Sequence, residues 1–103
     1  MDINGDISVE ELKALIENGE EFNFYDVRNE DEFEEDDLGA KLIPLGDLGY
    51  RIEELESIKG QHIYLHCRSG ARSGRAKEYL EQEGFKNVHN VLGGIMAYRA
   101  MKI

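Results

Sequence analysis

Short apolar runs alternate along this chain with segments in which hydrophobic residues recur every three or four positions. The apolar runs predict strands over residues 22–27, 38–43, 62–66 and 88–91. The helical spacing predicts helices between Ser8 and Gly19, over 48–58 and over 73–83, and a terminal helix that Gly93-Gly94 opens. This alternation favours an α/β fold, in which helices cover both faces of a mainly parallel sheet. In such sheets, functional sites lie at the carboxyl ends of the strands.

Polar residues at two predicted helix starts match capping patterns. Ser8 with Glu11 forms a capping box, and Gly19 follows the last helical position. Asn29 with Glu32 is expected to cap a short helical turn after the first apolar run, 22–27.

Length and composition are typical of one small domain. The chain has 103 residues, 41% of them hydrophobic, so a single domain over 1–103 with one core is expected. No apolar run reaches membrane-spanning length, and the acidic first residues are unlike a secretory signal. A lone cysteine is most easily kept reduced in the cytoplasm, which is the expected compartment.

Charge is distributed unevenly along the chain, whose net charge is −10. Residues 1–60 hold 5 basic and 19 acidic residues, whereas residues 61–103 hold 7 and 3. The overall charge disfavours nucleic acid as a partner, while the basic stretch after residue 67 favours small anions. Arg75 and Lys77 in this stretch are interpreted as solvated positions on a helix face, and the acidic run 30–37 as a solvated surface.

The candidate chemistry lies in a turn between the strand 62–66 and the following helix. Cys67 begins this turn, and Arg68 and Arg72 follow it. Backbone N–H groups of such a turn, together with a helix N-terminus, stabilise a bound anion. The same groups and the two guanidinium groups lower the pKa of a thiol, so Cys67 is a candidate nucleophile.

Three segments together resemble single-domain rhodaneses, the sulfurtransferase family, over almost the whole chain. They are Asp26-Val27-Arg28 with Glu32-Phe33, the loop Cys67-Arg68-Ser69-Gly70-Ala71-Arg72-Ser73, and Asn90-Val91-Leu92-Gly93-Gly94-Ile95. The resemblance implies a three-layer α/β domain with a mainly parallel central sheet of about five strands.

The resemblance also implies a sulfurtransferase that carries sulfane sulfur as a persulfide on Cys67. The sulfur would pass from thiosulfate or a protein persulfide to a nucleophilic acceptor. Loop N–H groups over residues 68–73 would stabilise the thiolate and then the persulfide. Arg68 and Arg72 would hold the anionic donor, Ser69 would add a hydroxyl donor, and Gly70 would allow a positive φ.

Three acidic and basic residues outside the loop are expected to support it. Asp26 and Arg28 would shape the site from beneath, and an Arg28–Glu32 ion pair would fix the surroundings of the loop. No metal and no cofactor are expected.

Two stretches concern partners or depart from the family. Asp36-Asp37 stands where many rhodaneses have a Gly-His pair, so no contact of that histidine is carried over. The stretch 38–45 resembles rhodanese domains attached to adenylyltransferases, which suggests a sulfur-carrier protein as acceptor.

Three alternatives to sulfur transfer remain open. A cysteine phosphatase or arsenate reductase has five residues between its cysteine and arginine, whereas four separate Cys67 from Arg72. The smaller loop suits one sulfur better than a tetrahedral phosphate. A non-catalytic rhodanese-like binding module usually lacks the cysteine, and thioredoxin-type chemistry needs a second one.

Overall fold

The computed structural model describes residues 5–101, in which four strands form one sheet. The strands are β1 (Asn23–Asp26), β2 (Lys41–Leu42), β3 (Ile63–His66) and β4 (Val88–Asn90). Their order is β2-β1-β3-β4, and each neighbouring pair is parallel. A parallel bridge from Ile7 to Val91 extends the sheet beyond β4. The expected sheet of about five strands thus consists of four strands and one bridging segment.

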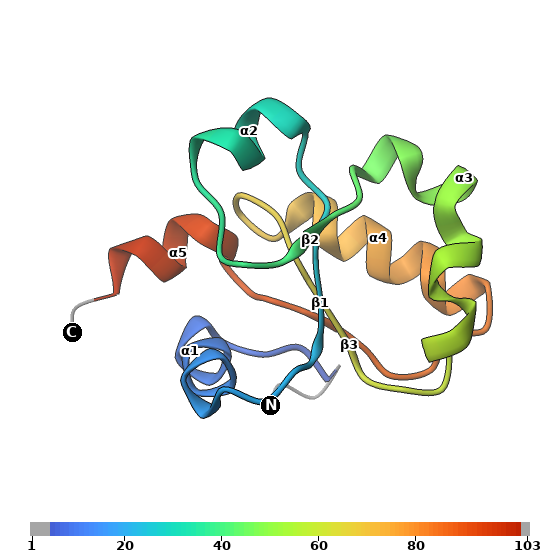
Figure 1. Ribbon diagram of the computed structural model, residues 1–103, viewed down its shortest axis with the longest axis horizontal. Helices are drawn as coiled ribbons and strands as arrows, with labels where there is room; N and C mark the ends of the chain where they lie inside the picture. The colour runs from blue at the N-terminus through green and yellow to red at the C-terminus, as the bar shows by residue number, and fades with distance from the viewer. Residues whose placement is uncertain (1–4, 102–103) are drawn as a thin grey trace.

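Helices cover both faces of the sheet, as the sequence predicts (Figure 1). On one face lie α1 (Val9–Asn18) and α5 (Gly94–Ala100), which pack against each other. The other face is covered by α3 (Leu48–Arg51), its 3-10 continuation η2 (Ile52–Ile58) and α4 (Ala71–Gln82). The short helix α2 (Glu30–Glu35) follows β1, and the turn η1 (Leu45–Asp47) precedes α3.

Three predicted elements differ from the observed ones in type or by at least two residues at a boundary. The helix predicted over 48–58 is one α-helical turn followed by a 3-10 helix. Arg51, which caps the start of the 3-10 helix, pairs with Glu54 three residues further on at 2.8 Å. The strand predicted over 38–43 shortens to 41–42, and the helix predicted from residue 73 begins at Ala71.

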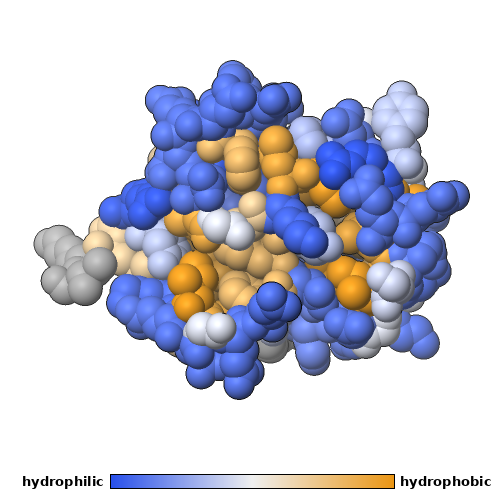
Figure 2. Space-filling model, in the orientation of Figure 1, coloured by the Kyte–Doolittle hydropathy of each residue, from blue (hydrophilic) through white to orange (hydrophobic). Residues whose placement is uncertain are grey.

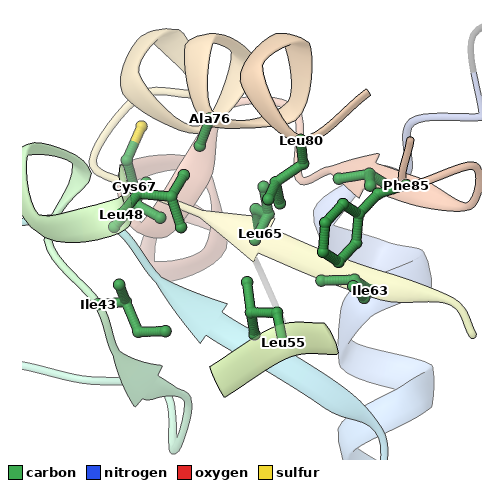
Figure 3. Packing of buried hydrophobic residues seen from close by; sticks show 11 residues of the cluster. Ile43, Leu48, Leu55, Ile63, Leu65, Cys67, Ala76, Leu80 and Phe85 are labelled. Carbon is green, nitrogen blue, oxygen red and sulfur yellow. The ribbon is translucent and has the colours of Figure 1, made fainter. Parts of the chain in front are cut away.

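Two apolar clusters lie on opposite faces of β3, whose four residues are all buried. Ile63 and Leu65 pack with Leu80 and Phe85 under α4, an arrangement visible in Figure 3. Tyr64 points to the other face, where α1 and α5 lie. Alternating side chains therefore anchor both helical layers to one strand.

Both predicted caps are present. The Glu11 N–H donates to Ser8 Oγ, and the Ser8 N–H donates to Glu11 Oε1, each at 3.1 Å. The Asn29 N–H donates to Glu32 Oε1, also at 3.1 Å. Gly19 ends α1 with a φ of 76°. Among residues 5–101, none of the helices combines the length and the apolar character that crossing a membrane requires.

The surface over α2 is acidic. Hydrophilic side chains gather over this helix in Figure 2. The exposed acidic residues of α2 are Glu30, Asp31, Glu34 and Glu35. This agrees with the interpretation of the run 30–37 as a solvated surface.

Candidate active site

Cys67 lies immediately after β3, at the edge where the carboxyl ends of the parallel strands meet. The loop that it begins leads directly into α4, whose N-cap Gly70 has a φ of 103°. An L side chain rarely adopts this φ, so glycine is required there, as the sequence predicts. In Figure 3 the Cys67 sulfur points toward the start of α4. The residue is 1% exposed.

The loop surrounds the Cys67 sulfur with hydrogen-bond donors. The Gly70 N–H donates to Sγ at 3.1 Å, and Ser73 Oγ lies 3.3 Å from Sγ. Burial raises the pKa of the thiol, but the Ser73 hydroxyl and the backbone N–H groups of Ser73, Gly70 and Ser69 lower it. The net effect is a pKa below the ordinary value, which favours the thiolate.

Helix α5 turns the loop carbonyls away from this sulfur. The Ile95 N–H donates to the Cys67 carbonyl at 2.9 Å, and the Met96 N–H donates to the Arg68 carbonyl at 3.0 Å. Gly94 makes this approach possible, because a Cβ there would lie 2.4 Å from the Cys67 carbonyl oxygen. The role of Gly94 in the site was not predicted from the sequence. The feature of the sequence that could have indicated this close approach is the Gly93-Gly94 pair.

A second anchor behind the loop is Asn90, whose role was likewise not predicted from the sequence. Asn90 is 7% exposed and follows two buried residues of β4. Its Nδ2 donates to the Gly70 carbonyl at 3.1 Å, and its Oδ1 accepts from Ser73 Oγ at 2.5 Å. The only signal in the sequence was its position at the start of the motif 90–95.

Lys77 is not solvated, contrary to the sequence-based interpretation. Its side chain is 9% exposed, and its ammonium group pairs with Asp6 at 2.6 Å. The same Asp6 carboxylate accepts the Asn90 backbone N–H at 2.9 Å. Helix α4 therefore contacts the N-terminal segment beside the loop anchor. Arg75 is exposed, as expected.

The expected Arg28–Glu32 ion pair is wrong. Arg28 instead pairs with Asp26 at 2.7 Å and donates to the Asp36 carbonyl at 2.6 Å. Asp26 is fully buried at the end of β1 and only two residues away, so its carboxylate takes the guanidinium in a forked contact. Asp36, part of the departure from the family pattern, thus contributes its backbone to this buried group.

Glu32 pairs with Arg72 of α4 instead. The two contacts, from Nη1 and Nη2, are 2.7 and 2.8 Å long. Their hydrogen bonds lower the pKa of Glu32 to about 2. Because its fork is occupied by Glu32, Arg72 is not available to hold an anionic donor in the way expected from the sequence.

Arg68 has a different environment from Arg72. Its side chain is exposed and makes no ion pair or hydrogen bond within residues 5–101. It lines a cleft of about 500 Å³, together with Glu35 of α2 and Met96 of α5. Ser69 and Ala71 are also exposed beside it. The one guanidinium of the loop without a carboxylate partner therefore faces this cleft.

His66 is fully buried beside the Asp26–Arg28 pair. Its Nε2 lies 3.5 Å from Asp26 Oδ2 and makes no hydrogen bond to any described residue. Burial, the largest effect, lowers the pKa of His66. The imidazole is therefore neutral at pH 7 and packs against Phe24 at a ring-centroid distance of 5.2 Å.

The protein has a parallel three-layer α/β fold, and a loop that begins with a cysteine joins a strand to a helix. It is therefore an α/β domain whose candidate site contains a thiol. Comparison with known proteins narrows the class. The model of the rhodanese-like domain matches residues 8–101. The chain belongs to the rhodanese-like domain family.

Relatives in sequence and in structure agree with this assignment. The chain is 39% identical over 94 residues to "Putative sulfurtransferase YtwF" of Bacillus subtilis, covering 90% of this chain and 88% of the relative. It is 37% identical over 91 residues to "Putative sulfur carrier protein YrkF" of the same organism, of whose length the match covers 48%. A rhodanese-like domain protein of Staphylococcus aureus superposes with a TM-score of 0.82 at 30% identity, covering 95% of this chain and 96% of that one.

Proposed function

We propose that this chain is a rhodanese-type sulfurtransferase that carries sulfane sulfur as a persulfide on Cys67. The observation that carries the proposal is the convergence of the Gly70 N–H and the Ser73 hydroxyl on Cys67 Sγ. Membership of the rhodanese-like family and the similarity to proteins named as a sulfurtransferase and a sulfur carrier support it. The proposal treats residues 1–103 as one catalytic unit.

The first step is attack by the Cys67 thiolate on the outer sulfur of a donor such as thiosulfate. A bond forms between Sγ and that sulfur, and the S–S bond of thiosulfate breaks with its electron pair leaving on sulfite. A nucleophilic acceptor then attacks the terminal sulfur, and Cys67 leaves as a thiolate. No general base is needed when the thiol is already ionised. A persulfide on a protein would serve as donor by the same exchange.

The loop donors stabilise negative charge on sulfur at both ends of this cycle. The backbone N–H donors among them, such as that of Gly70, are fixed before the sulfur donor arrives, so their dipoles need no reorganisation during the reaction. Arg68 attracts the anionic donor, because no carboxylate neutralises it in the described part of the chain. Asp26 and Arg28 form a buried support, and the Glu32–Arg72 pair ties α2 to α4.

Intact-mass measurement tests the proposal directly. The reduced wild type and Cys67→Ser are incubated with thiosulfate, excess donor is removed, and the intact mass of each protein is measured by mass spectrometry. The proposal expects a gain of one sulfur atom by the wild type only, which cyanide removes as thiocyanate. Exchange with a protein persulfide is measured in the same way when thiosulfate leaves no adduct.

Two outcomes contradict the proposal. A folded, reduced wild type that gains sulfur from neither donor would favour a binding module. Turnover of an aryl phosphate that Cys67→Ser abolishes would favour a cysteine phosphatase.

A further inference from the structure

Ser73 and Asn90 share one proton within reach of the candidate nucleophile. Ser73 Oγ lies 2.5 Å from Asn90 Oδ1 and 3.3 Å from Cys67 Sγ. The hydroxyl has a single hydrogen to donate. Ser73 is 0% exposed, Cys67 1% and Asn90 7%, so bulk water has little access to replace a lost contact.

The orientation of the Asn90 amide follows from its other contact. The Gly70 carbonyl can only accept, so the group 3.1 Å from it is the amide nitrogen. The amide oxygen must then face Ser73. Because this oxygen carries no hydrogen, the 2.5 Å contact requires the Ser73 hydroxyl to donate to Asn90.

This arrangement suits a neutral thiol but conflicts with a thiolate. While Cys67 is protonated, its S–H can donate to the lone pair of Ser73 Oγ, and all contacts are satisfied. When the thiol ionises, the sulfur needs the hydroxyl proton that Asn90 Oδ1 already accepts. Turning the proton to sulfur leaves a buried amide oxygen without a donor, which is costly.

We propose that Asn90 is a positioning residue that competes with Cys67 for the Ser73 hydroxyl proton and so limits how strongly the loop stabilises the thiolate. The inference rests on the proposed function of Cys67 as nucleophile. A thiolate stabilised too strongly is a weak nucleophile, because nucleophilicity falls with the pKa of the thiol. Asn90 thereby keeps Cys67 reactive while its amide nitrogen holds the Gly70 carbonyl in place.

Ion pairs hold most of the charged groups around this network, and the Ser73 hydroxyl is the contact that can change its partner. Asp26 pairs with Arg28 below the loop, and Glu32 pairs with Arg72 at its side. The remaining titratable and charged groups nearby are His66, the exposed Arg68, and the Asp6–Lys77 pair behind Asn90.

The pH dependence of Cys67 alkylation by iodoacetamide tests the competition. The midpoint of this profile gives the thiol pKa without any sulfur donor. Asn90→Ala is expected to lower the midpoint by about half to one pKa unit, the size of one modest hydrogen bond. Asn87→Ala is the matched control, because Asn87 also donates to a carbonyl, that of Gly60, but far from the loop.

A second background separates the competition from a purely structural role. In Ser73→Ala there is no shared proton, so adding Asn90→Ala is expected to leave the midpoint unchanged. An equal shift in both backgrounds, or no shift in a folded Asn90→Ala, would overturn the inference.

The wild type provides a test that needs no substitution at Asn90. Release of Oδ1 on ionisation is expected to move the Asn90 side-chain carbonyl signal in an NMR titration, with the same midpoint as alkylation. The movement is expected to be smaller in Ser73→Ala, and an equal movement there would contradict the competition. These results are independent of the mass measurement: a persulfide without coupling refutes only the role of Asn90, and coupling without a persulfide refutes only sulfur transfer.

Discussion

Substituting Gly94 by alanine is expected to displace the candidate catalytic loop. A Cβ on Gly94 would lie 2.4 Å from the Cys67 carbonyl oxygen and 2.5 Å from that of Arg68. Both atoms belong to backbone, so no flexible side chain can move aside. The same carbonyls accept the second and third N–H groups of α5, from Ile95 and Met96. Relief of the clash therefore requires α5 and the loop to separate.

The expected cost combines two effects. Overpacking of this kind costs about 1–3 kcal/mol. A left-handed backbone, here with a φ of 58°, costs a further ~1–2 kcal/mol with an L side chain. Gly94→Ala is thus expected to lower the free energy of unfolding by about 2–5 kcal/mol. For a chain of this size, that corresponds to a fall in Tm on the order of 10–30 °C.

Two control variants separate these effects. Gly39 has a φ of 89° with nothing within 4 Å of its added Cβ, so Gly39→Ala measures conformational strain without a clash. Gly46 has open space and no positive φ, so Gly46→Ala is expected to be close to neutral. Urea denaturation gives the three free energies, and iodoacetamide alkylation reports the Cys67 environment. A Gly94→Ala protein as stable as Gly39→Ala, with an unchanged alkylation profile, would refute the reasoning.

Two further predictions concern charged side chains of the site. The folded pKa of Glu32 is about 2, against 4.5 for the ordinary group, so its pairing with Arg72 stabilises the fold above pH 4.5 and is lost as the pH falls toward 2. Glu32→Gln is expected to cost about 1–2 kcal/mol at pH 7, discounted for partial exposure. The cost is expected to be much smaller near pH 2, where about half of the Glu32 carboxyls of the folded protein are protonated. Urea titrations with an equal loss at both pH values would contradict this. Arg68→Ala is expected to slow persulfide formation from thiosulfate about tenfold at low salt, because the variant attracts the anion less strongly, while its stability is unchanged. The rate is measured from the intact masses of samples quenched at successive times. Arg75→Ala, which removes an exposed arginine from α4, the helix that follows the loop, serves as the control. An equal loss in both variants would show only a general effect of charge.

Features encoded by neighbouring residues could be predicted from the sequence. The capping boxes at Ser8 and Asn29, the positive φ at Gly70 and the position of Cys67 after a buried strand all depend on a few adjacent positions. Periodicity was enough to place the helices on both faces of a parallel sheet. The fold and the location of the loop were therefore accessible without any tertiary information.

The charge pairing within the site was not predictable in this way. Arg28 has Asp26 two positions before it and Glu32 four positions after it, and local spacing does not choose between them. The choice depends on Arg72, forty residues beyond Glu32, which α4 brings alongside α2. The burial of Lys77 has the same origin, because Asp6 reaches it only after the N-terminal segment has docked beside β4.

The two motifs that surround the site act as one structure. Three carbonyl groups of the loop, at Cys67, Arg68 and Gly70, each accept a hydrogen bond from the segment 90–96. A peptide plane whose carbonyl is held on one side presents its N–H on the other, so the bond to the Arg68 carbonyl helps to direct the Ser69 N–H toward the sulfur. The segment 90–96 thus influences the electrostatic environment of Cys67, although the hydrogen bonds to its sulfur within residues 5–101 come from Gly70 and Ser73. Substitutions there are consequently expected to change thiol reactivity as well as stability, and the Gly94 and Asn90 variants measure the two contributions separately.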